Sequence, residues 1–307
     1  MRLEGLEMTD KMRRKVIFVT VLLAFWSFLS CSREESLTPT RFRDDLLFEF
    51  PQGNTEIDRR IQTIQENFNC YVIYKDIEQN HLNRAWINLY PGMVFVANPV
   101  PQNHLNTYLS FLEDNIFRYF NPQLHSTLFP RYFFLVDGLH REDNGVAKAH
   151  IPCRTDGVDF WSLSFQSDQD GYILQYDEKK MRITFAYKAI TLAFNNGLIK
   201  IPSTFSEGID YKNPVYGDPS NEWHYQTRGF VKYVQPDFEY ESPATDITVI
   251  AMAGEDFLMY VRKILFSTPE TFAAENGKYD LVMRRYGIVL DVFSEFGIDL
   301  NAIATGE

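Results

Sequence analysis

The order of β-prone and helical patterns along the chain is the feature that most constrains its fold. Buried β-prone runs lie at 132–136 and 158–165, and a hairpin or edge strand is expected at 171–174. From Met181 onward, apolar residues recur at steps of three and four, and Gly197 is placed to end that helix. Further helices are predicted at 245–264, 269–275 and 278–296. Strands that come early, one central helix and a helical C-terminal half predict an α+β fold with a small mixed sheet.

Two shorter patterns open this predicted domain. Apolar residues at helical spacing predict a helix over 57–68, and the β-prone run 71–74 follows it directly. A second amphipathic helix is expected over 105–119. No internal repeat and no second linker interrupts these patterns, so residues 46–307 are predicted to form a single domain.

The amino-terminal segment predicts a secretory leader. A basic stretch at 11–15 precedes an uncharged, mostly apolar run at 16–30, which is typical of a signal peptide and short for a membrane span. The run ends at Phe28-Leu29-Ser30-Cys31, which resembles the lipobox of bacterial lipoproteins. That resemblance implies cleavage after residue 30 and a lipid on Cys31. The alternative is an ordinary cleaved signal in which Cys31 is an incidental thiol.

The residues after Cys31 indicate how the domain would be attached. The polar stretch 31–45 lacks apolar periodicity and is predicted to be a flexible tether. The acidic residues that follow Cys31 resemble the signal that sends some lipoproteins to the cell surface, and the periplasmic face remains the alternative. The chain carries a net charge of −11, so the expected membrane anchor is the lipid, and nucleic acid is excluded as a partner.

A search for catalytic and metal-binding motifs finds little. The chain has no Walker loop, dinucleotide fingerprint, G-x-S-x-G elbow or C-x-x-C pair. The acidic run 168–171 is predicted to be a tight turn rather than a calcium loop. Six scattered histidines include no pair four residues apart, and His150 with Cys153 is the nearest approach to a ligand cluster. Cys70 and Cys153 could form a disulfide or remain two buried thiols.

From about residue 130 onward, a series of segments occurs in a family-like order. They are Pro130–Asp137, the helix over 182–196, Ile201–Ser206, Trp223, Gly229–Tyr233, Gly254–Val261 and Phe296–Leu300. Together with the lipobox, their order and spacing resemble the substrate-import-associated zinc metallohydrolases, a family of bacterial lipoproteins whose genes neighbour outer-membrane nutrient importers. The resemblance implies a zincin-like peptidase fold for most of the mature chain.

The chain departs from this family at the catalytic motif. In the family the central helix carries H-E-x-x-H, whose histidines bind zinc and whose glutamate polarises water. Here Tyr187, Lys188 and Thr191 stand at those positions, so the zinc ligands and the general base are absent and no cofactor is predicted. Glu255 and Asp256 match the later acidic motif, which in the family supplies or supports the third ligand. The alternatives are that Tyr187 and Thr191 line the core and that the acidic pair stabilises a helix start.

The resemblance leaves three functional hypotheses. The leading one is a catalytically degenerate lipoprotein of the outer membrane that serves importer subunits as an accessory binding or scaffolding part. Its cleft would take a peptide or glycan along an aromatic wall, although core packing is the commoner fate of such rings. The second is a hydrolase with relocated metal ligands or a carboxylate mechanism, and the third is a structural lipoprotein without a ligand. The candidate wall comprises Trp223, Tyr225, Phe230 and Tyr233.

Overall fold

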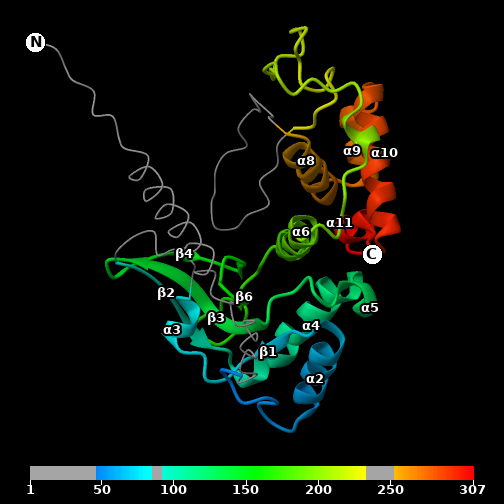
Figure 1. Ribbon diagram of the computed structural model, residues 1–307. Coiled ribbons are helices and arrows are strands. Elements are labelled where there is room, and N and C mark those ends of the chain that lie inside the picture. The colour runs from blue at the N-terminus through cyan, green and yellow to red at the C-terminus, as the bar shows by residue number, and fades with distance from the viewer. Residues whose placement is uncertain (1–45, 85–91, 233–251) are drawn as a thin grey trace, which may run out of the picture. The chain divides into compact units, whose positions relative to one another are not determined.

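The computed structural model describes residues 46–84, 92–232 and 252–307, and residues 48–307 form one compact unit (Figure 1). The predicted leader, Cys31, the tether up to residue 45 and Tyr233 lie outside the described residues. Within the described part of the chain, no helix is both long and apolar enough to cross a membrane.

A six-stranded mixed sheet is organised around its longest strand, β3. The first half of β3 pairs in parallel with β1 and β6, and the second half pairs antiparallel with β2 and β4. The short strand β5 pairs antiparallel with β6. In chain order the strands are β1 (Tyr71–Ile73), β2 (Met93–Pro99), β3 (Tyr132–Asp143), β4 (Val146–His150), β5 (Cys153–Arg154) and β6 (Phe160–Phe165).

The two halves of β3 have different environments. Residues 132–137 are all buried, because side chains cover both faces of the sheet there. On one face Phe133 packs against Phe185, with ring centroids 5.0 Å apart. On the other face Phe134 packs against Phe48, with centroids 5.4 Å apart. The second half is polar and only partly buried, so the strand is longer than the predicted run at 132–136.

Helices make up most of the rest of the described chain. The predicted helices over 57–68, 181–197, 269–275 and 278–296 are confirmed to within a few residues, and residues 245–251 of the predicted helix at 245–264 lie outside the described part. The α-helices are α2 (Glu56–Phe68), α3 (Gln79–Leu82), α4 (Leu105–Asn115), α5 (Pro122–His125), α6 (Glu178–Asn195), α7 (Ser203–Ser206), α8 (Ala253–Phe266), α9 (Pro269–Asn276), α10 (Asp280–Glu295) and α11 (Leu300–Thr305). The two 3₁₀ turns are η1 (Gln102–His104) and η2 (Phe117–Tyr119).

Helix α6 is the central helix that the periodicity predicts. The Asp177 side chain caps its start by accepting a hydrogen bond from the backbone N–H of Lys180 at 2.9 Å. Gly197, with φ at +72°, takes the left-handed conformation that follows the helix end. The Phe185 side chain packs on the sheet, while other faces of the helix contact α8 and α11. The α+β prediction is therefore confirmed, with a small mixed sheet, a central helix and a helical C-terminal half.

The structure shows the state of the two cysteines and the conformation of the acidic run at 168–171. Cys70 and Cys153 are separate buried thiols, and burial raises the pKa of Cys70. The predicted turn at 168–171 is confirmed, because Asp168 Oδ1 accepts hydrogen bonds from the backbone N–H groups of Asp170 and Tyr172. The expected hairpin is reduced to a single bridge between Ser167 and Ile173.

Candidate functional site

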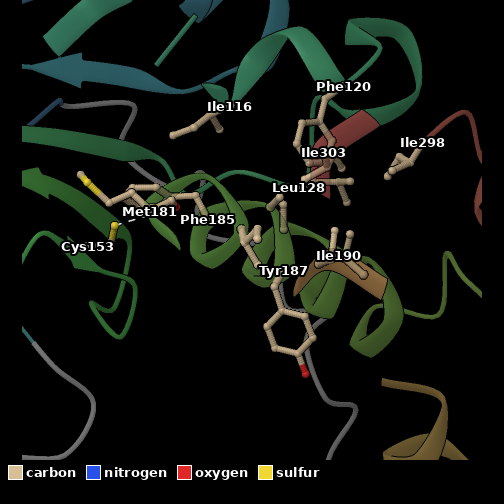
Figure 2. Packing of buried hydrophobic residues seen from close by; sticks show 14 of the residues in the cluster. Ile116, Phe120, Leu128, Cys153, Met181, Phe185, Tyr187, Ile190, Ile298 and Ile303 are labelled. Atoms are coloured by element: carbon tan, nitrogen blue, oxygen red, sulfur yellow. Dashed lines mark hydrogen bonds between the residues drawn. The ribbon is translucent and has the colours of Figure 1, made fainter. Parts of the chain in front are cut away.

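The three motif positions lie on α6, where Tyr187 is buried and Lys188 and Thr191 are partly buried. Tyr187 is 8% exposed, and the Arg262 guanidinium lies 4.7 Å from the centroid of its ring. The Thr191 hydroxyl donates to the Tyr187 carbonyl, one turn earlier in the same helix, at 2.8 Å. Figure 2 shows the Tyr187 ring extending away from Met181 and Phe185, which point into the core. A phenol against a guanidinium, an ammonium at Lys188 and an internally bonded hydroxyl do not fit a zinc ion.

The two acids at the start of α8 point to different environments: Glu255 is exposed and Asp256 is buried. Glu255 is exposed in the first turn, where a negative charge stabilises the helix dipole. Asp256 is fully buried and pairs through Oδ2 with Arg285 of α10, which is also fully buried. The Tyr211 hydroxyl donates to the same oxygen at 3.0 Å. Burial raises the pKa of Asp256, and the Arg285 charge and the hydrogen bonds oppose that rise.

Arg285 also bonds the backbone of α7 and of the loop at Gly229. Its Nε donates to the Phe205 carbonyl at 2.9 Å, and its Nη1 donates to the Gly229 carbonyl at 2.5 Å. The Tyr260 hydroxyl donates to the same Gly229 carbonyl at 2.6 Å. The guanidinium carbon lies 3.9 Å from the centroid of the Phe205 ring. Asp256 is therefore part of a buried network that joins α7, α8, α10 and the loop at Gly229, and this does not fit the role of a zinc ligand.

Of the four residues of the predicted aromatic wall, Tyr233 lies outside the described residues, and the other three have different environments. Phe230 is 1% exposed and packs edge-on against Tyr211, so it belongs to the core. Tyr225 is half-buried against His224, with ring centroids 4.6 Å apart. Trp223 keeps part of its surface and lies beneath the guanidinium of Arg228, 4.9 Å away. Phe230 therefore has almost no exposed surface to offer to an open wall, because its ring is buried against Tyr211.

A polar cluster that the sequence analysis did not find lies where the paired part of β3 and β6 ends. Asp137 and Phe165 are register partners there. The Ser167 hydroxyl donates to Asp137 Oδ1 at 2.9 Å and lies 3.4 Å from His104 Nδ1. Behind them, the Tyr108 hydroxyl donates to the Val136 carbonyl at 2.9 Å and accepts from the Phe165 backbone N–H at 3.0 Å. The site brings together residues from η1, α4, β3 and the segment after β6.

A second imidazole borders the same cluster. His150, at the end of β4, lies with Nε2 3.2 Å from the Ser164 hydroxyl. Burial lowers the pKa of His150, while the charge of Asp137 opposes that shift. The signal that could have located the cluster was the pairing of β3 with β6, since parallel strands end at the same edge of a sheet and place Asp137 beside the segment with Ser164 and Ser167.

Within 46–84, 92–232 and 252–307, no three His, Cys, Asp or Glu side chains are close enough to form a metal site. His150 and Cys153, the nearest approach in the sequence, are used separately, since His150 faces Ser164 and Cys153 lies 3.9 Å from the Met181 carbonyl.

No family model matches the chain, and no curated protein matches it. The chain is similar to a crystal structure from Bacteroides caccae ATCC 43185, described as a "putative zinc-binding metallo-peptidase", with a TM-score of 0.48 and 7% sequence identity. The alignment covers 81% of this chain and 89% of that one.

Proposed function

We propose that the chain is a bacterial outer-membrane lipoprotein, anchored through Cys31, whose zincin-like domain has no zinc-dependent catalysis. It serves a nutrient-import system as an accessory binding or scaffolding component. The observation that carries the proposal is the buried ion pair of Asp256 with Arg285. It occupies the acidic position that would complete a zinc site, while Tyr187, Lys188 and Thr191 replace the helix ligands.

The metal content of the full chain tests this proposal. After incubation with zinc and dialysis, elemental analysis is expected to find far less than one zinc per chain, because no imidazole pair is present on α6. Peptidase activity that requires metal is expected to be absent, and Glu255→Gln is expected to change neither result. One tightly held zinc per chain, with chelator-sensitive peptide hydrolysis, would overturn the proposal.

The lipid anchor has its own test. Cys31→Ser is expected to abolish incorporation of labelled fatty acid and to release the protein from the membrane fraction, since a single modified thiol would carry the anchor. Cys70→Ser is the matched control, because that thiol is buried in the core. Labelling that survives in Cys31→Ser would rule out this anchor, and absence of label from the unmodified protein would leave an ordinary signal peptide.

A hydrolase with a carboxylate mechanism remains the second candidate, and the cluster at Asp137 favours it. There the Ser167 hydroxyl lies within hydrogen-bonding range of both the Asp137 carboxylate and the His104 imidazole. The activity assay separates the two candidates. Turnover that resists chelators and disappears in Asp137→Asn, with the fold intact, would favour the hydrolase.

A further inference from the structure

An open cavity of about 310 Å³ is lined by residues of α2, α4, η2 and the start of α5, and by none of α6 or α8. Its volume is at the lower end of the range for small-molecule pockets. The apolar part of its lining is aromatic and includes Phe68, Phe117 and Phe120. The polar part includes Thr63 and Asn67 on the exposed face of α2, together with the charged residues Arg60, Glu113 and Arg118.

The aromatic part of the lining is held rigidly. Phe68 and Phe117 stack with centroids 4.8 Å apart, and each packs on Phe129 behind them. Phe120 meets Phe129 edge-on at 5.1 Å. All four rings are at least nine-tenths buried, so the three that line the cavity form a floor that cannot rearrange without disturbing the core. This surface suits one compact apolar group.

The two arginines that line the cavity, Arg60 and Arg118, differ in how many of their N–H donors are already bonded. Arg60 donates through Nε and Nη2 to Glu113, and through Nη1 to Asn106 at 2.6 Å, so its charge is already neutralised. Arg118 is exposed, and its Nη2 donates to the Gly306 carbonyl at 2.6 Å and to the Tyr119 hydroxyl at 2.7 Å. Within the described part of the chain, its Nε and Nη1 donate to no protein group, and no carboxylate pairs with it.

We propose that this cavity binds the carboxylate end of an apolar acid, such as a peptide that ends in an apolar residue. The Arg118 guanidinium receives the carboxylate, the rings of Phe68, Phe117 and Phe120 receive the apolar side chain, and Asn67 hydrogen-bonds the preceding amide. Charge complementarity supports this choice, because Arg118 is the uncompensated charge in the lining of an otherwise acidic protein. The site is independent of the proposed function and stands or fails separately from it.

The test compares an acid with its amide on the unmodified full chain. N-acetylglycyl-phenylalanine is expected to bind with a Kd near 1 mM, and its C-terminal amide at least about tenfold more weakly, as measured by calorimetry or NMR titration. Arg118→Gln is expected to reduce binding of the acid to the level of the amide. Arg59→Gln is the matched control, because Arg59 is exposed on α2, pairs with Glu56 and does not line the cavity.

A second variant locates the binding without touching the charge. Asn67→Trp places a large side chain at the mouth of the cavity from an exposed helix position and is expected to abolish binding of the acid. Thermal unfolding monitored by circular dichroism checks that each variant is folded. Equal binding of acid and amide, no binding of either up to about 10 mM, or unchanged binding in folded Arg118→Gln would each overturn the proposal.

Discussion

Replacing Arg285 with Met is expected to lower the free energy of unfolding by about 3–5 kcal/mol, because it leaves the carboxylate of Asp256 buried without its partner. The substitution also removes donors to the carbonyls of Phe205 and Gly229, so α7 and the loop at Gly229 each lose a hydrogen bond to α10. Chemical denaturation with urea measures the change, and the midpoint of thermal unfolding is expected to fall by roughly 6–20 °C.

Two controls show whether the effect comes from the unpaired charge. The double variant Asp256→Leu/Arg285→Met is expected to be more stable than Arg285→Met alone, since it removes the buried charge as well as its partner. Arg59→Met breaks an exposed pair with Glu56 and is expected to change stability by less than about 1 kcal/mol. A loss below about 1 kcal/mol in Arg285→Met would contradict the view that this pair is a structural centre.

The pH dependence of Arg285→Met follows from the same carboxylate. Burial already raises the pKa of Asp256 above its ordinary value of 3.8, and loss of the neighbouring guanidinium removes an opposing effect. At pH values between the pKa of Asp256 in the unfolded chain and its higher pKa in the folded variant, the native state then binds a proton that the unfolded state lacks. The free energy of unfolding of this variant is therefore expected to fall as pH rises through that window, so its stability deficit is smallest in acid.

The sequence predicted the helices and strands that show an apolar pattern within their own segment. The β-prone run at 132–136 and the helical spacing after Met181 gave β3 and α6, because burial on both faces of a strand, or around a helix, leaves a dense apolar pattern. Strands β2 and β4 were missed. β4 is almost wholly exposed and carries Lys148 and two alanines, so its pairing with β3 depends on the tight turn at Asn144 and Gly145 rather than on an apolar pattern.

The site was harder to predict than the fold because its contacts join distant parts of the chain. Asp256 and Arg285 are 29 residues apart, and no local pattern marks Arg285 as the partner of the acid. His104, Asp137 and Ser167 come together only through the pairing of β3 with β6. The sequence did indicate that Tyr187 and Thr191 would be poor ligands, since that depends on the chemistry of the side chains alone.

Replacing Phe185 with Ala is expected to lower the free energy of unfolding by about 3–5 kcal/mol, because it removes the ring that holds α6 on the sheet. Phe185 is fully buried and lies 5.0 Å from Phe133 and 6.0 Å from Trp161, centroid to centroid. Phe194→Ala, nine residues later in the same helix and only half-buried, is the matched control and is expected to cost about half as much. Urea denaturation measures both variants. Equal losses at the two positions would show that the contact of Phe185 with the sheet stabilises α6 no more than the contact of Phe194 with Phe257 of α8, and would contradict the prediction.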